Sequence, residues 1–104
     1  MARFDVYANP DAGERTLIPY FLDVQNDHIL GLQTRVVVPL WASDSLGTKV
    51  ADLNPEFEMG GLRVVMDTPA LGAVPVAVLK HLVGNLTSQQ LPIQNALDTL
   101  FGEF

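Results

Sequence analysis

The chain contains no cysteine among its 104 residues. A disulfide framework and a thiolate metal site are therefore excluded, and cysteine usage carries no information on the redox compartment. The two histidines, His28 and His81, lie far apart and neither belongs to a motif with metal-ligand spacing. We expect His28 on a surface loop and His81 at a polar position of an apolar element, with no metal ion and no other cofactor bound.

Basic residues are scarce as well: six Lys or Arg stand against 12 Asp or Glu, which gives a net charge of −6. Nucleic-acid binding needs a basic patch that displaces counterions from the phosphates, so we expect no direct binding to nucleic acid. Only 17% of the residues are charged and 48% are hydrophobic, a composition that argues against disorder. Because little polar surface remains, we expect a partner or a second copy to cover part of the apolar excess.

Long hydrophobic runs are also missing. None approaches the roughly 20 residues that a membrane-spanning helix needs, and residues 1–7 alternate between polar and apolar instead of forming a signal-peptide core. We therefore expect a cytoplasmic protein with no membrane partner. The length predicts one domain, residues 1–104, with a core of its own.

What the sequence does contain is a series of short apolar blocks rich in β-branched and aromatic residues. Such blocks are too short for free-standing helices and fit the pleated surface of a sheet. The strand at 34–40 is uninterrupted and apolar, so we expect it to be buried on both faces. Strands are predicted at residues 3–8, 16–25, 34–40, 56–59 and 62–66, the last two joined by a Gly60-Gly61 hairpin turn.

One amphipathic helix is predicted after the strands. Thr87 and Gln90 have the spacing of a capping box. Pro92 disfavours a start as early as Thr87, because a proline at the fifth helical position loses a hydrogen bond and crowds the preceding turn. The regular helix is therefore expected to begin between Ser88 and Leu91. Its apolar side chains recur at steps of three and four residues, which places them in one stripe: Ile93, Ala96, Leu97, Leu100, Phe101 and Phe104.

Strands followed by one docked helix predict an α+β fold that is mainly β, a small antiparallel barrel with a C-terminal amphipathic α-helix. Residues 41–50 are mixed and predict irregular structure, with Trp41 a core or interface aromatic. Residues 73–83 are apolar without a period that distinguishes strand from helix, so their conformation stays undecided.

The residue patterns of common enzymes are missing from the sequence, which has no G-x-S-x-G and no glycine-rich loop opening a helix. Asp23 and Asp27 straddle a predicted strand end; turn capping by Asp27 and a surface or hydrogen-bonded Asp23 are favoured over an acid–base pair. Arg15, Arg35 and Arg63 are the candidates for holding phosphates, and each is interpreted more simply as a solvated strand residue. We therefore expect a protein that acts by binding another protein and is not an enzyme.

Ordered blocks of sequence run through the chain: Phe4-Asp5-Val6-Tyr7, Phe21-Leu22-Asp23-Val24-Gln25 followed by Asp27, Val38-Pro39-Leu40, Val74-Pro75-Val76-x-Val78, and Asn95-Ala96-Leu97 with Phe101. In this order and at this spacing they resemble the CcdB family of bacterial toxins. The resemblance implies a small SH3-like barrel with a C-terminal helix, a fold shared with the Kid and MazF toxins, and a homodimer. This agrees with the strand-then-helix arrangement inferred from the residues.

The same resemblance implies the toxin of a toxin–antitoxin pair, a class associated with plasmid maintenance. Toxins of this type bind the A subunit of DNA gyrase and trap this topoisomerase on cleaved DNA. A cognate antitoxin neutralises them by laying a flexible segment over the toxin dimer. A protein target agrees with the acidic charge of this chain.

The resemblance also marks positions that contact gyrase. His28 and Ile29 stand where the family has two successive isoleucines, and Asp98 stands where a helix asparagine is frequent. The family's Trp-Gly-Ile tail corresponds to Gly102-Glu103-Phe104, so the indole anchor is absent here. The gyrase-contact candidates are His28, Ile29, Asp98, Phe101, Gly102, Glu103 and Phe104, and the dimer-interface candidates are Leu100, Phe101 and Phe104.

Alternatives to a gyrase-poisoning toxin stay open. Because the contact positions depart from the family more than the structural ones, one alternative is a non-toxic or retargeted chromosomal homologue that keeps the dimer and antitoxin binding. Another is an mRNA-cleaving nuclease of the MazF type, which the small number of basic residues disfavours. Phe101 likewise has two interpretations, as a core residue of the helix or as a binding residue.

Overall fold

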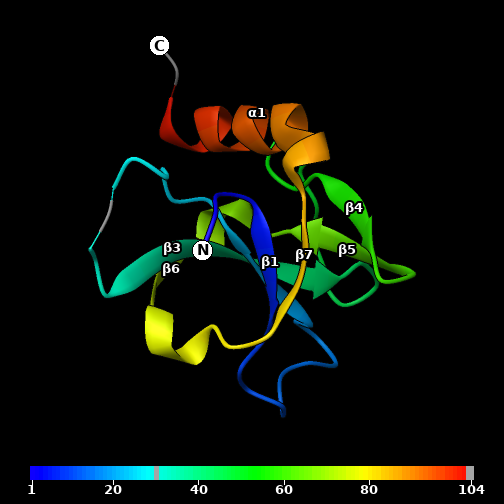
Figure 1. The fold of residues 1–104 in the computed structure, drawn as a ribbon. Coiled ribbons are helices and arrows are strands. Elements are labelled where there is room, and N and C mark those ends of the chain that lie inside the picture. The colour runs from blue at the N-terminus through cyan, green and yellow to red at the C-terminus, as the bar shows by residue number, and fades with distance from the viewer. Residues whose placement is uncertain (30, 103–104) are drawn as a thin grey trace.

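The computed structural model describes residues 1–29 and 31–102. Within these residues, seven strands form one antiparallel sheet, and a single α-helix lies across one side of it (Figure 1). The strands are β1 (Asp5–Ala8), β2 (Tyr20–Asp23), β3 (Thr34–Ala42), β4 (Glu56–Met59), β5 (Leu62–Met66), β6 (Gly72–Pro75) and β7 (Leu82–Asn85). Short 3-10 helices are η1 (Thr68–Ala70), η2 (Val76–Val78) and η3 (Thr87–Gln89), and the α-helix is α1 (Gln90–Phe101).

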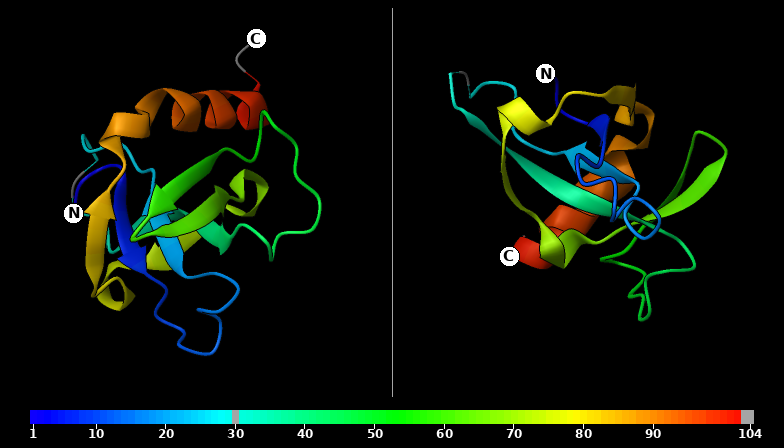
Figure 2. Two further views of the ribbon diagram at one scale, coloured as in Figure 1. Left: turned by 90° about the vertical axis from the view of Figure 1, so that its right-hand side faces the viewer. Right: turned by 90° about the horizontal axis from the view of Figure 1, so that it is seen from below.

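The strand order is β4-β5-β3-β2-β1-β7, and β6 pairs with β3 outside this path. The nine-residue β3 is the centre of the sheet: its first half pairs with β6, from Thr34 to Val37, and its second half pairs with β5, from Leu40 to Ala42. The views in Figure 2 show a strongly curled sheet, a half-barrel with α1 along one side. The predicted α+β fold, mainly β with one C-terminal helix, is confirmed.

Apolar side chains form two clusters because successive residues of a strand point to opposite faces of the sheet. On one face, Val6 and Leu22 are fully buried together with Ile93 of α1. On the other face, Tyr7 packs with Leu79, which follows η2. The sheet is therefore covered on both sides, by α1 over the larger cluster and by the η2 segment over the smaller one.

The helix begins at Gln90, inside the predicted interval. Pro92 is its third residue, and the first four N–H groups of a helix have no partner within the helix, so the proline loses no hydrogen bond there. The capping-box prediction is wrong, because no side chain caps this N-terminus and the Thr87 hydroxyl donates to Asn85 instead. No helix in the described part of the chain is long and apolar enough to cross a membrane.

The predicted strands are present, with different ends. β1 begins at Asp5 and β2 covers only four residues, because the chain before Pro19 folds into turns held by the carbonyl of Glu14. β3 continues to Ala42 because it gains pairing from β5, so the irregular prediction for residues 41–50 is wrong at its start. The undecided residues 73–83 divide into strand, 3-10 turn and strand.

The β4–β5 hairpin follows the sequence prediction. Gly60 and Gly61 have φ angles of 60° and 79°, the left-handed values that a two-residue type I′ turn requires at both central positions. A side chain is strained in this region of φ/ψ space, so glycine at both positions sets the turn and, with it, the register of the two strands.

Candidate functional site

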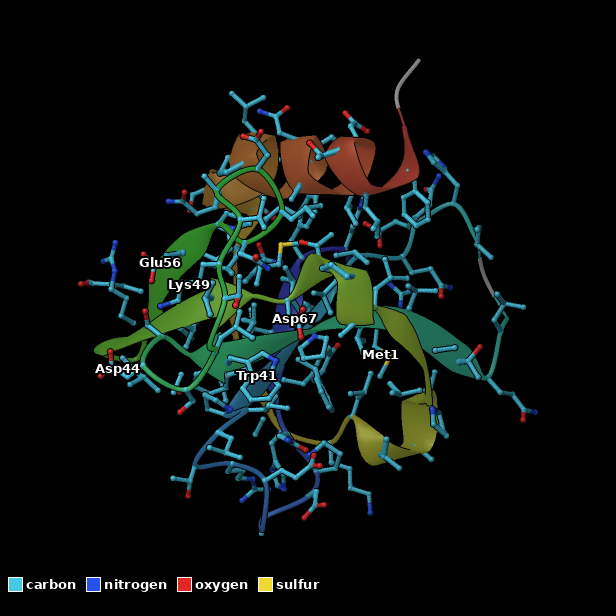
Figure 3. The ribbon with its side chains drawn as sticks, turned by 180° about the vertical axis from the view of Figure 1, so that it is seen from behind. Met1, Trp41, Asp44, Lys49, Glu56 and Asp67 are labelled. Carbon is cyan, nitrogen blue, oxygen red and sulfur yellow. The ribbon has the colours of Figure 1, made fainter. Side chains whose placement is uncertain are left out.

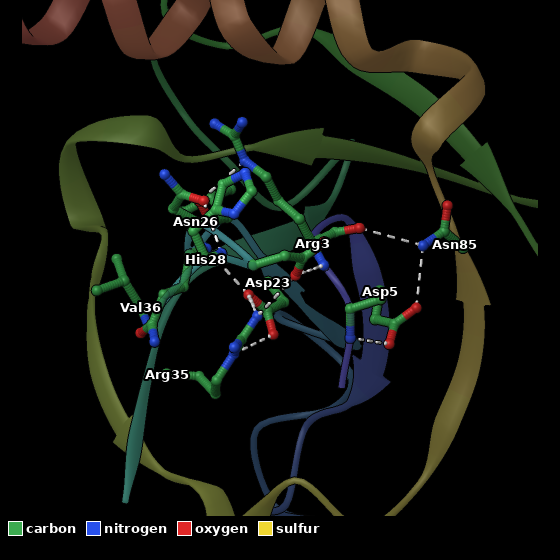
Figure 4. A network of polar contacts seen from close by, with 12 residues as sticks. Arg3, Asp5, Asp23, Asn26, His28, Arg35, Val36 and Asn85 are labelled. Carbon is green, nitrogen blue, oxygen red and sulfur yellow. Dashed lines mark hydrogen bonds and ion pairs between the residues drawn. The ribbon is translucent and has the colours of Figure 1, made fainter. Parts of the chain in front are cut away.

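A buried ion pair lies between β2 and β3. Arg35 donates from Nε to Asp23 Oδ2 at 2.7 Å and from its terminal nitrogen to Oδ1 at 2.9 Å, and the Asp23 side chain is fully buried (Figure 4). This hydrogen-bonded carboxylate raises the pKa of Arg35. The interpretation of Arg35 as a solvated strand residue is wrong, because β6 pairs alongside this half of β3 and the arginine is only 7% exposed. Asp23 was expected either on the surface or in a hydrogen bond, and the hydrogen-bonded interpretation is confirmed.

Tyr7 of β1 is a second buried titratable group near this pair. Burial raises the pKa of Tyr7 to about 12, and the neighbouring carboxylate of Asp5, whose Oδ2 accepts the phenol at 3.3 Å, contributes in the same direction. The phenol therefore stays protonated and uncharged across the physiological range.

The loop after β2, residues 24–29, is tied to this region by side-chain hydrogen bonds. Asp23 Oδ1 accepts the N–H of Gln25 at 3.0 Å, and Gln25 Oε1 accepts the N–H of Val36 at 3.0 Å. The prediction that Asp27 caps the turn is wrong: Asn26 accepts the local N–H of residue 28, because its side chain precedes the turn. Asp27 instead accepts the N–H of residue 3 at 2.7 Å and lies 3.7 Å from the Arg35 guanidinium.

The C-terminal half of α1 faces this loop. Ile93, Ala96 and Leu97 of the predicted stripe are buried, whereas Phe101 is 69% exposed. The interpretation of Phe101 as a core residue is therefore wrong for the isolated chain. Phe101 is the last residue of α1 and lies one helical turn beyond Leu97, the last buried residue of the helix.

Loop and helix enclose a cleft with a volume of about 350 Å³. Its lining is mostly apolar, with Val24 and Leu97 at the sides, and Arg3 contributes to the wall. Ile29, Asp98 and Phe101, which are far apart in the sequence, line this one cleft. The structure thus brings together three of the residues predicted to contact gyrase.

The other residues predicted to contact gyrase or a second copy lie near this cleft or outside the described residues. His28 is exposed on the loop, as predicted, next to Ile29. Gly102 follows the last helical residue with φ of 77° and donates its N–H to the carbonyl of Asp98 at 2.9 Å, the geometry of a helix-ending glycine. Leu100 is half-buried. Glu103 and Phe104 lie outside the described residues.

Other side chains considered from the sequence lie elsewhere. His81 is exposed between η2 and β7 and not within an apolar element, because the segment turns there. Trp41 is half-buried at the end of β3, where its indole N–H donates to Asp67 at 3.0 Å (Figure 3). Among residues 1–29 and 31–102, no group of three or more His, Cys, Asp or Glu side chains is placed to hold a metal ion.

Sequence reasoning missed Arg3 and Gln94, two polar residues of the cleft wall. Gln94 and Asp98 are four residues apart on a helix and hydrogen-bond each other at 3.0 Å, a spacing that the sequence does contain. The contact between Arg3 and Gln94 joins the two ends of the chain, and no local pattern could have indicated it.

A family model described as CcdB protein matches residues 3–102, nearly the whole chain. The match covers β1 through α1, including both walls of the cleft. The chain belongs to the CcdB family, and the resemblance found in its sequence blocks is confirmed.

Proposed function

From this family membership, we propose that the protein is the toxin of a toxin–antitoxin pair and acts by binding the A subunit of DNA gyrase, not by catalysis. The observation that carries the proposal is the cleft between the loop and α1, in which Ile29, Asp98 and Phe101 meet. In this proposal, the gyrase A subunit occupies the cleft, and gyrase is thereby held on cleaved DNA. A cognate antitoxin neutralises the toxin by covering the toxin homodimer.

The chemistry of the cleft suits a protein partner. Phe101 is 69% exposed and Ile29 46% exposed, so two large apolar side chains lie at the mouth of one mostly apolar cleft. Aromatic side chains next to a cleft are the usual anchors of protein–protein interfaces, and Asp98 supplies a charged group beside them. An exposed apolar patch of this kind marks a surface that a partner covers.

We expect the affinity for gyrase to be low, on the order of tens of micromolar or weaker. Gly102 stands where the family places its tryptophan and offers no side chain. Glu103 in place of the family's glycine adds a carboxylate that must stay in water or find a cation, since an unpaired buried charge is costly. This departure also favours the second candidate function, a homologue that keeps the dimer and the antitoxin but is non-toxic or has a different target.

The test is binding of the full chain to the purified gyrase A subunit by calorimetry, with DNA cleavage by gyrase as a second readout. Phe101→Ala should weaken binding by about tenfold or more while sedimentation still gives the dimer, because the same side chain is also expected at the dimer interface. Leu91→Ala is the matched control, because Leu91 is 71% exposed on the same helix but does not line the cleft. Equal losses in the two variants, or no binding by the natural chain at high micromolar concentration, would remove gyrase as the target and favour the retargeted homologue.

The tail offers a gain-of-function test. Replacing Gly102-Glu103-Phe104 with Trp-Gly-Ile should strengthen gyrase binding and raise toxicity in a laboratory bacterium. Gly102→Trp alone should gain less, because φ of 77° strains any side chain, whereas the triple variant keeps a glycine one residue later to end the helix. Growth arrest by the natural chain that disappears on deletion of residues 103–104 would contradict the expected low affinity.

We also propose a homodimer whose interface includes Leu100, Phe101 and Phe104. Leu100 is half-buried and Phe101 exposed in the single chain, so a second copy could cover both. Sedimentation should give a dimer at micromolar concentration, and a monomer would contradict the proposal. The nuclease alternative predicts specific RNA cleavage that is lost when Arg35 or Arg63 is replaced; we expect the chain to leave RNA intact.

A further inference from the structure

Arg3 is hydrogen-bonded to both walls of the cleft. Its backbone N–H donates to Asp27 Oδ1 at 2.7 Å, and its side-chain Nε donates to the carbonyl of Val24 at 3.2 Å. Its terminal nitrogen donates to Gln94 Oε1 on α1 at 3.0 Å. Gln94 in turn donates to Asp98 at 3.0 Å, so this chain of contacts reaches the residues expected to meet the partner. Among the side chains that the structure describes, only that of Arg3 hydrogen-bonds to both walls.

The backbone beside Arg3 is strained in a way that aims this side chain. Phe4 has φ of 71°, a left-handed value that large side chains rarely adopt, so its backbone is strained. Phe4 is held there because the residue is buried, its N–H donates to the carbonyl of Asp23 at 2.7 Å, and its carbonyl accepts the N–H of Leu86 at 2.8 Å. The turn leaves the Arg3 guanidinium 4.8 Å from the Phe4 ring and directed toward α1 (Figure 4).

We propose that Arg3 is a positioning residue that clamps the loop 24–29 to α1 and so sets the shape of the cleft. Arg3 lines the cleft itself, but its effect on a partner passes through the loop and through Gln94. The positioning is a property of the free protein. Its consequence for gyrase binding rests on the proposed function.

The first measurement is of backbone ¹⁵N order parameters in the free full-length protein. Arg3→Ala should lower the order parameters of residues 25–29 to about 0.6 or less, while those of the β4–β5 hairpin stay at about 0.85. Arg3→Lys should not restore the loop, because a single ammonium group lacks the planar fork that reaches Val24 and Gln94 at once. Arg63→Ala, which removes a cation that is exposed on β5, is the matched control and should change neither region.

The second measurement separates the clamp from the target. Arg3→Ala and Gln94→Ala should each weaken binding to the gyrase A subunit by about tenfold, and the double variant should be no weaker than Arg3→Ala alone. A mobile loop in Arg3→Ala together with no gyrase binding by the natural chain would support the clamp and reject the gyrase target. An ordered loop in Arg3→Ala would overturn the clamp, and so would full rescue by Arg3→Lys or an equal loss of order in the hairpin.

Discussion

Two strand pairs of this protein carry the same cross-strand arrangement of an arginine and a carboxylate. On β2 and β3, Asp23 lies opposite Val37, two residues from Arg35; on β4 and β5, Glu56 lies opposite Val65, two residues from Arg63. The first pair is buried and bidentate, with N–O distances of 2.7 and 2.9 Å, whereas the second is exposed, with an N–O distance of 3.8 Å. Cross-strand spacing therefore does not set how much an ion pair contributes to stability. What sets this contribution is whether other segments of the chain pack over the pair and exclude water.

The energetic difference follows from solvent. Water screens the exposed pair, and double-mutant measurements give such pairs less than about 1 kcal/mol. Even the lowered pKa of Glu56 has the Ser43 hydroxyl as its main cause, with Arg63 contributing less. In the buried pair, removal of one partner leaves the other charge without water or counterion, which is expensive. The loss in free energy of unfolding on removing the arginine should therefore differ several-fold between the two pairs.

The largest effect is expected for Arg35→Ala, which leaves the carboxylate of Asp23 buried and unpaired. The free energy of unfolding, measured by urea denaturation, should fall by about 3–5 kcal/mol. Replacing both members together, Asp23→Leu with Arg35→Met, should cost clearly less than Arg35→Ala, because no lone charge is then buried. A loss below about 1 kcal/mol for Arg35→Ala would mean that the pair is solvated in solution.

A smaller effect is expected at alkaline pH from Tyr7, which lies on the same side of the sheet. Its pKa is raised from 10.0 to about 12, so its contribution to stability is complete below pH 10 and is lost as pH rises through 12. The free energy of unfolding should fall by up to about 2 kcal/mol over this window. Tyr7→Phe should remove this decline. If Tyr7→Phe showed the same fall in stability between pH 10 and pH 12, the fall would come from other titratable groups.

In the β4–β5 hairpin, Gly61→Ala should lower the free energy of unfolding by roughly 1 kcal/mol. The space around Gly61 is open, but its φ of 79° strains any side chain. Gly47→Ala is the matched control, with equal space and no left-handed φ. Thermal denaturation of the two variants gives the comparison. Equal melting temperatures would contradict the requirement for glycine in the turn.

The smallest effect is expected for Arg63→Ala, within about 0.5 kcal/mol of the natural chain at physiological salt. The arginine side chain is 59% exposed, so its loss leaves no buried charge. The difference in free energy of unfolding between Arg63→Ala and Arg35→Ala measures how much burial changes the contribution of the ion pair. A loss of stability similar to that of Arg35→Ala would contradict the conclusion that burial sets the contribution of each ion pair.

Much of the fold could be predicted because its signals are local. The hairpin turn at Gly60-Gly61 and the helix start near Pro92 depend on neighbours in the chain, and both predictions were confirmed. The candidate site was predictable in part: Ile29, Asp98 and Phe101 came from the family resemblance, and the structure places them on one cleft. The capping box failed because a spacing permits a hydrogen bond without requiring it.

Periodicity, turn residues and ordered blocks are properties of the chain alone, so they were sufficient to predict the mainly β fold, its C-terminal helix and the family. The burial of Arg35, the exposure of Arg63 and the hydrogen bond from Arg3 to Gln94 arise only when distant segments pack together. Solvent exposure and long-range contacts depend on which distant segment covers a residue. Strand residues with similar neighbours in sequence therefore acquire different roles when β6, η2 and α1 pack over some of them and leave others in water.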